Sequence, residues 1–182
     1  MKIKLNNVRL SYPSLFEATD YEGDGVFKFR ATFLIPKGSP LDKEIQAAVA
    51  TVAKEAWGEK YQSILDSIKH NPNKAGYRDG DTKPDSDGYA GNMFIVASNK
   101  SRPLVIDKDK TPLVAADGRP YSGCYVNATI NIFAYENKGK GISASLGGVQ
   151  FFKDGDAFSG GGVATADEFD DISEGADASD LV

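Results

Sequence analysis

The chain is poor in the residues that build many catalytic and metal sites. Among its 182 residues, Cys124 is the only cysteine and His70 the only histidine. A single cysteine can form neither an intrachain disulfide nor a thiolate metal site. His70 follows an expected helix end, where its charged form favours the helix dipole, and we expect no Ser-His-Asp triad. We therefore expect a protein without enzymatic activity that needs neither a metal nor a cofactor.

Long apolar runs are also missing. No stretch approaches the roughly 20 apolar residues of a membrane helix. The first residues, MKIKLNNVRL, lack the apolar segment and the cleavage site of a signal peptide. The expected location is the cytoplasm, with no membrane partner.

Basic residues are absent from residues 154–182. All 21 Lys and Arg lie in residues 1–153 with 17 of the 26 acidic residues, which leaves an excess of four positive charges there. The other nine acidic residues follow without a single base. A weakly basic body joined to an acidic tail is typical of nucleic-acid proteins. The composition predicts a folded unit over residues 1–158 and a disordered acidic tail over 159–182, with Gly160-Gly161-Gly162 as a flexible hinge.

The folded part is expected to consist of strands with two helices inserted among them. Ser39 and Pro40 are predicted to begin a first helix that ends at Gly58, and a second runs from Tyr61 to about Lys69. Apolar patterning predicts strands over residues 2–12, 26–36, 92–98, 103–107, 123–135 and 141–152. The first strand changes parity at Asn6-Asn7, which predicts a β-bulge. In the second strand the predicted apolar face comprises Phe27, Phe29, Ala31, Phe33 and Ile35. Residues 71–91 are predicted to form a long polar loop.

Aromatic and basic residues are interleaved in the predicted loops and on the outer strand faces. Single-stranded nucleic acid is bound by such mixtures, because cations follow the phosphates and exposed rings stack on unpaired bases. The alternative for any one of these residues is a ring in the core or a solvated cation. The candidate DNA-binding residues are Tyr12, Phe16, Lys28, Arg30, Tyr77, Arg78, Tyr89, Lys100, Arg102, Tyr121, Tyr125 and Lys140.

Two further features have two interpretations each. The polar face of the strand over 123–135 is either a stacking platform or a surface covered by the helices, with Asn127 and Asn131 in structural hydrogen bonds. The acidic residues of the 71–91 loop could indicate a metal site, but their spacing does not match a calcium loop, and a solvated loop is favoured. These acidic residues are Asp79, Asp81, Asp85 and Asp87.

Three stretches of the chain resemble a family of phage-encoded single-stranded DNA-binding proteins with an OB-fold. They are VRLSYPSLFE (8–17), DGYAGNMFIVASNKSRPLVID (87–107) and YSGCYVNATINIFAYENKGKGISASLGGVQFFKDG (121–155). The resemblance implies a mainly β fold, an OB-like Greek-key β-barrel with an inserted helical pair. It implies sequence-tolerant binding of single-stranded DNA in phage replication and recombination, in the host cytoplasm. It also implies an acidic tail that competes with DNA and recruits replication proteins such as a polymerase or helicase.

The tail residues expected to contact partners are acids with an aliphatic tip. They are Asp167, Glu168, Asp170, Asp171, Glu174, Asp177, Asp180, Leu181 and Val182. A solubilising extension is the alternative for the tail. The alternatives for the whole protein are a strand-annealing or recombination protein, a nuclease and a protein-interaction module. The sequence also leaves a homodimer open.

Overall fold

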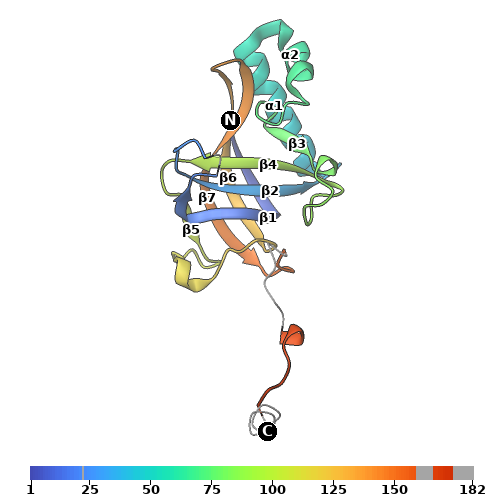
Figure 1. Cartoon of the computed structure of the whole chain (residues 1–182). Helices are drawn as coiled ribbons and strands as arrows, with labels where there is room; N and C mark the ends of the chain where they lie inside the picture. Colours follow the sequence, from blue (N-terminus) through green and yellow to red (C-terminus); the bar gives the residue numbers. More distant parts are fainter. Residues whose placement is uncertain (22, 159–165, 174–182) are drawn as a thin grey trace.

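Five strands close into a barrel in the computed structural model, which describes residues 1–21, 23–158 and 166–173 (Figure 1). The barrel strands are β1 (Lys2–Thr19), β2 (Lys28–Pro36), β4 (Asn92–Asn99), β6 (Tyr125–Glu136) and β7 (Lys140–Lys153). They pair in the order β1-β2-β4-β7-β6, and β6 returns to β1. Only the β4–β7 pair, at Ser98 and Ser145, is parallel among these five contacts. This is the connectivity of an OB-like barrel, so the expected mainly β fold is confirmed.

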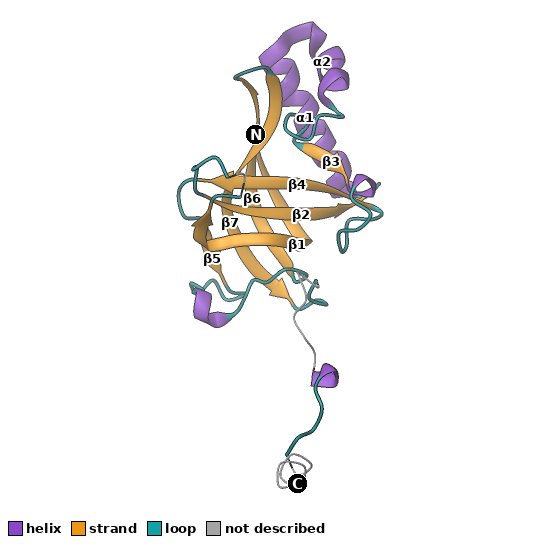
Figure 2. Ribbon diagram, viewed as in Figure 1, coloured by secondary structure: helices purple, strands orange, loops and turns teal. Residues whose placement is uncertain are grey.

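The two α-helices belong to one insertion between β2 and β4 (Figure 2). The insertion contains α1 (Pro40–Trp57), α2 (Tyr61–Ile68) and the short strand β3 (Tyr77–Asp79), which pairs with β4. A further strand, β5 (Leu104–Ile106), runs parallel to β7. No helix in the described part of the chain is long and apolar enough to cross a membrane.

The ends of α1 follow from local chemistry. The Ser39 hydroxyl accepts a hydrogen bond from the Asp42 N–H at 3.1 Å, and Pro40 occupies the first turn, where its missing N–H costs nothing. Gly58 ends the helix with a φ of 68°, a left-handed conformation that glycine adopts without strain. Both predicted boundaries of this helix are confirmed.

The predicted irregularity in the first strand is present. Asn7 has a φ of 53°, and the pairing of β1 with β6 shifts register between Leu5 and Val8. As a result, Leu5 and Val8 both point into the barrel although their sequence parity differs. The strand is longer than predicted and continues to Thr19.

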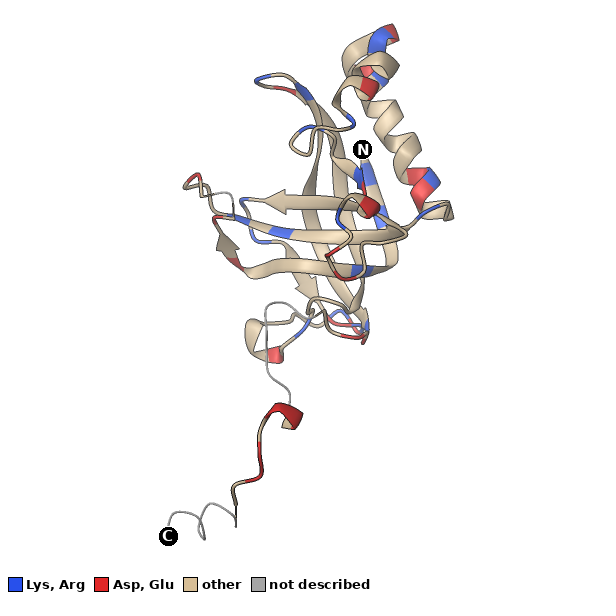
Figure 3. Ribbon diagram, turned by 45° about the vertical axis from the view of Figure 1, so that its right-hand side comes forward, with Lys and Arg blue, Asp and Glu red and all other residues tan. Residues whose placement is uncertain are grey.

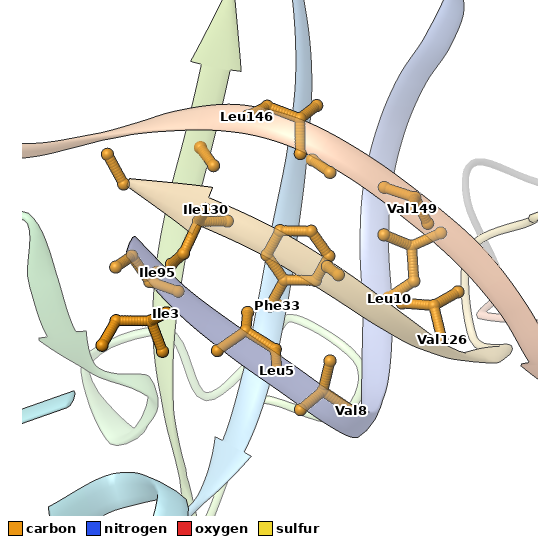
Figure 4. Close-up of a cluster of buried hydrophobic side chains, with 14 of the residues drawn as sticks. Ile3, Leu5, Val8, Leu10, Phe33, Ile95, Val126, Ile130, Leu146 and Val149 are labelled. Atoms are coloured by element: carbon orange, nitrogen blue, oxygen red, sulfur yellow. The ribbon is translucent and has the colours of Figure 1, made fainter. Parts of the chain in front are cut away.

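The core fills the barrel around Phe33, which is fully buried (Figure 4). Ala31, Phe33 and Ile35 alternate inward along β2, as their spacing predicts. The inclusion of Phe27 in this face was wrong. Phe27 precedes β2 in the hairpin and is 60% exposed.

A second, smaller apolar cluster lies outside the barrel. It consists of Leu34 on β2, Phe94 on β4 and Tyr89 from the loop that precedes β4, with Phe158 packed against them. We call it the outer cluster. It lies on the outer face of β2 and β4, on the side of these strands opposite to the main core.

Candidate nucleic-acid interface

A groove of about 830 Å³ crosses the outer face of β2 and β4. One wall comes from β1 and the β1–β2 hairpin, and the other from residues 72–76 and the beginning of β7. Its lining residues are Tyr12, Pro13, Ser14, Tyr21, Asp24, Val26, Lys28, Arg30, Thr32, Pro72, Asn73, Gly76, Arg78, Lys83, Ser86, Tyr89, Phe94, Val96, Ser98, Ile142 and Ser143. The groove is therefore lined by segments that are far apart in the sequence, from β1 to the beginning of β7.

The second wall is fixed to the β6–β7 hairpin. The Ile142 N–H donates to the Lys74 carbonyl at 2.8 Å, and the Tyr135 hydroxyl donates to the Asn73 carbonyl at 3.1 Å. A Cβ at Gly76, where φ is 75°, would lie 2.6 Å from Ile142 Cγ2. Only glycine fits this backbone conformation and this close approach, which keeps the wall at a set distance from the groove floor.

Positive charge dominates the groove. Among the described residues, its lining contains Lys28, Arg30, Arg78 and Lys83 but only one acidic residue, Asp24. None of these four cations forms an ion pair with an acidic residue of the described chain. Unpaired cations along a groove attract an anionic ligand, and single-stranded nucleic acid is held in grooves of this kind.

Arg78 and Lys83 form the most concentrated part of this charge, and we call them the Arg78–Lys83 clamp. The Arg78 guanidinium lies 4.7 Å from the centre of the Phe94 ring, and Lys83 Nζ lies 5.4 Å from the same ring. Burial lowers the pKa of Arg78, and burial and the charge of Arg78 together lower the pKa of Lys83. Two partly desolvated cations on an apolar floor are stabilised by an anion that bridges them, such as a phosphate.

Hydrogen bonds and ion pairs around β3 position this clamp. The Tyr77 hydroxyl donates to Asp42 Oδ1 at 2.7 Å, which ties β3 to the start of α1. Lys37 Nζ lies 2.6 Å from Asp79 and 2.5 Å from Asp81. These hydrogen bonds raise the pKa of Lys37 and lower those of both carboxyl groups.

The 71–91 segment is therefore more ordered than the predicted polar loop. It contains β3 and a short 3-10 turn over Gly80–Thr82, and Asp79 and Asp81 are ion-paired. In the described part of the chain, no group of three or more His, Cys, Asp or Glu residues is arranged to hold a metal ion.

Two aromatic rings in the groove are open to solvent. Tyr12 is 60% exposed and Tyr21 is 76% exposed. Tyr12 was among the predicted residues, whereas Tyr21 was missed because an isolated tyrosine among Asp, Glu and Gly gives no pattern. Exposed rings beside cations supply the stacking faces that unpaired bases require.

Tyr89 differs from the exposed ring that the sequence predicted. It is only 2% exposed, belongs to the outer cluster, and donates its hydroxyl hydrogen to Ser11 Oγ at 3.1 Å. Burial raises the pKa of this phenol. Tyr89 supports the floor of the groove from below and has no free face for a base.

Replacing Tyr89 with leucine should therefore act on stability. The variant loses the buried hydrogen bond to Ser11 and part of the ring's packing, so we expect the free energy of unfolding to fall by about 1.5 kcal/mol in urea titrations. Tyr12→Leu is the matched control and should change it by less than about 0.5 kcal/mol. Equal losses in the two variants would contradict the assignment of Tyr89 to the outer cluster.

The other predicted aromatic residues have structural contacts outside the groove. Phe16 packs against the main core, and the Tyr121 hydroxyl donates to Asp154 Oδ1 at 2.8 Å. Cations lie over the Tyr125 ring, with Arg9 at 5.7 Å and Lys153 at 4.8 Å from its centre. Tyr77 is half-buried in its hydrogen bond to Asp42. Each of these rings is thus held in place by contacts with other residues of the protein.

Three predicted cations also lie outside the groove lining. Lys100 and Arg102 follow the end of β4, where the Arg102 guanidinium lies 5.5 Å from the centre of the Phe29 ring. Lys140 is 3.6 Å from Glu136 in the β6–β7 hairpin. Of the predicted set, the groove thus brings together Tyr12, Lys28, Arg30, Arg78 and the buried Tyr89. Contacts of the remaining residues with DNA stay a prediction.

The polar face of β6 is not covered by the helices. The core residues of α1 share one cluster with the apolar face of β6, while Phe133 on the opposite face is 38% exposed. The two asparagines do form structural hydrogen bonds: Asn127 Oδ1 accepts from the Asn7 N–H, and Asn131 Oδ1 accepts from the N-terminal ammonium.

The acidic C-terminal segment is attached beside the groove. Arg9 donates to the Asp156 carbonyl at 2.7 Å, and its guanidinium lies 4.3 Å from the centre of the Phe158 ring. The described part of the tail, residues 166–173, is exposed and contains acidic residues without a base (Figure 3). The predicted hinge at 160–162 and the predicted tail contacts of Glu174, Asp177, Asp180, Leu181 and Val182 lie outside the described residues.

The chain is similar to known proteins of bacteriophages. The chain is 62% identical over 175 residues, covering 95% of both chains, to "Putative protein p50" of Acyrthosiphon pisum secondary endosymbiont phage 1. It is similar to the solved "Single-stranded DNA-binding protein from bacteriophage Enc34 in complex with ssDNA", with 31% identity, a TM-score of 0.73, and coverage of 87% of this chain and 89% of that one.

A more distant structure shares the fold alone. It is "gp2.5, a Single-Stranded DNA Binding Protein Encoded by Bacteriophage T7", at 13% identity and a TM-score of 0.54, with coverage of 93% of this chain and 97% of that one. The family model described as "Enterobacter phage Enc34, ssDNA-binding protein" matches residues 1–182. The chain therefore belongs to the Enc34 family of phage single-stranded DNA-binding proteins.

Proposed function

We propose that this protein binds single-stranded DNA in the groove across β2 and β4, without reading its sequence. The observation that carries the proposal is a set of four cations, none ion-paired with a described acidic residue, beside two exposed tyrosine rings. Phosphate contacts and stacking are common to all four nucleotides, so this arrangement gives affinity without base identity. The relative solved in complex with single-stranded DNA supports the assignment.

The biological role follows from sequence-independent binding of single-stranded DNA. We infer that the protein covers single-stranded DNA during phage replication and recombination in the host cytoplasm and performs no chemistry on it. The carboxylates of Asp79 and Asp81 form ion pairs with Lys37, and that of Asp107 forms one with Arg119. A nuclease would need such carboxylates to bind its metal ions.

The acidic tail gives the protein a second function in this proposal. Residues 1–158 bind DNA, and residues 159–182 compete for the same groove when DNA is absent. Once DNA displaces the tail, its acids are free to dock on a basic surface of a replication protein such as a polymerase or helicase. The exposed acidic side chains at Asp167, Glu168, Asp170 and Asp171 support this proposal.

Fluorescence anisotropy with labelled oligonucleotides tests the central proposal. We expect similar affinity for oligo(dT) and for a mixed-sequence strand, and much weaker binding of the corresponding duplex. The logarithm of affinity should fall with the logarithm of salt concentration with a slope of about −2 to −3, which corresponds to three or four phosphate contacts at about −0.7 each. Equal binding of single strand and duplex, or affinity that does not depend on salt, would contradict the proposal.

A further inference from the structure

The β1–β2 hairpin presents an aromatic ring at one end of the groove. The hairpin is stabilised by its own side chains, because Asp20 accepts hydrogen bonds from the Asp24 and Gly25 N–H groups and Asp24 accepts one from the Val26 N–H. Tyr21 lines the groove from this hairpin and is the most exposed aromatic side chain in the described part of the chain. An exposed ring that lines the groove beside a cation is placed to contact an unpaired base there.

Arg30 lies beneath this ring. Its guanidinium is 5.3 Å from the centre of the Tyr21 ring, and its Nη2 donates to the Thr19 carbonyl at 3.3 Å. Its Nε is buried and has no hydrogen-bond partner within the described residues, an unfavourable condition in a protein interior. The hydrogen bond and the ring contact hold Arg30 under the hairpin, and Tyr21 is supported from the side that faces the barrel.

Tyr21 and the Arg78–Lys83 clamp lie at different points along the groove. Arg30 pairs with Ser98 on β4, and Arg78 pairs with Phe94, four residues away along the same strand. At about 3.4 Å per residue, these two positions are about 14 Å apart along the β4 backbone. A DNA strand with one phosphate at the clamp can therefore extend along the groove and place one of its bases at Tyr21.

We propose that Tyr21 stacks on an unpaired base of the bound strand and that Arg30 is the positioning residue that holds the Tyr21 ring for this contact. The inference rests on the proposed function of the groove. The base ring takes the solvent-facing side of Tyr21, and the Arg30 guanidinium remains on the other. A duplex cannot make this contact, because its bases are already stacked on one another, so Tyr21 contributes to the preference for single strands.

The test uses oligo(dT) and an abasic oligonucleotide of the same length, with affinity measured by anisotropy. Tyr21→Leu should bind oligo(dT) five- to tenfold more weakly, the loss of one base–aromatic contact, whereas Tyr21→Phe keeps the ring and should stay within twofold. On the abasic strand, which offers no base to stack, Tyr21→Leu should equal the wild type. Phe27→Leu is the matched control, since Phe27 is an exposed ring of the same hairpin that does not line the groove.

The role of Arg30 is tested in a double-mutant cycle. Arg30→Lys keeps the charge but loses the planar guanidinium, and we expect about threefold weaker binding of oligo(dT) that disappears when Tyr21 is already leucine. Tyr21→Leu binding within twofold of wild type, equal losses on oligo(dT) and abasic DNA, or fully additive effects of the two substitutions would each overturn the inference. None of these results removes groove binding itself, whereas a wild-type protein that does not bind oligo(dT) would overturn the proposed function.

Discussion

Replacing Arg78 and Lys83 together with alanine is expected to weaken binding of single-stranded DNA about 100-fold at low salt. Each charge-assisted contact with a phosphate contributes about 1.5–3 kcal/mol, and two contacts at the lower end of this range correspond to about two orders of magnitude. The slope of log affinity against log salt should become shallower by about 1.4, because two counterions fewer are released. Anisotropy titrations at several salt concentrations measure both quantities.

The fold of this double variant should be intact. Neither Arg78 nor Lys83 forms an ion pair with a described acidic residue, and burial opposes the charge of both. The matched control is Lys2→Ala with Lys4→Ala, which removes the same charge from exposed positions of β1 outside the groove. A control that loses as much affinity as the clamp variant would show that net charge, and not the clamp, determines binding.

The barrel and its helices could be predicted because their signals are local. Alternation along β2 identified Ala31, Phe33 and Ile35 as core residues, and the change of parity in β1 identified the bulge at Asn7. The Ser39 cap and Gly58 set the ends of α1 through contacts within a few residues of the chain. Patterns of this kind depend only on the repeat of a strand or a helix, so they can be recognised without knowing which other elements pack against it.

The clamp could not be predicted as a unit, because its geometry depends on residues distant in sequence. Arg78 and Lys83 lie in a segment without periodicity, and their positions depend on Lys37 at the end of β2 and on Asp42 in α1. Arg78 was among the predicted DNA-binding residues, whereas Lys83 was not. Both lie against the Phe94 ring only after β3 pairs with β4.

Aromatic residues were the least predictable part of the site. Tyr12 and Tyr89 occur in similar polar contexts, but Tyr12 is exposed and Tyr89 is buried in the outer cluster under Phe158. Tyr21 and Phe27 lie in one hairpin, and only Tyr21 lines the groove. Whether a ring faces a ligand, the core or solvent is decided by the segment that folds over it, which composition does not encode.

The same outer cluster determines where the acidic tail leaves the barrel. The Tyr121 hydroxyl accepts from the Gly155 N–H, the Ser122 carbonyl accepts from the Phe158 N–H, and Arg9 holds the Asp156 carbonyl. Phe158 then packs against the cluster that contains Tyr89 and Phe94, which both line the groove. Phe158 is thus held close to the Arg78–Lys83 clamp, and the acidic residues beyond it are tethered to this point of the barrel.

Deleting residues 163–182 is therefore expected to raise the affinity for single-stranded DNA about thirtyfold at low salt. The deletion removes seven acidic residues and no base. A tail tethered next to the clamp has an effective concentration of about 3 mM. If the tail binds the groove with a dissociation constant near 0.1 mM, at the weak end of non-specific association, it lowers the apparent affinity for DNA by the ratio of these two concentrations, about thirtyfold. Titrations of both proteins with oligo(dT) at low and moderate salt measure the effect.

Three comparisons make this experiment specific to competition. The gain should shrink as salt rises, because exposed charges are screened beyond about 10 Å at 0.1 M salt. The melting temperature should not fall, since the described part of the deleted segment is exposed and packs on no core. A full-length chain with the seven acids changed to Asn or Gln should bind DNA as tightly as the truncated one. If truncation leaves affinity unchanged, the tail does not reach the groove. If the neutralised tail still inhibits, its effect is steric, and the electrostatic competition between the tail and DNA is rejected.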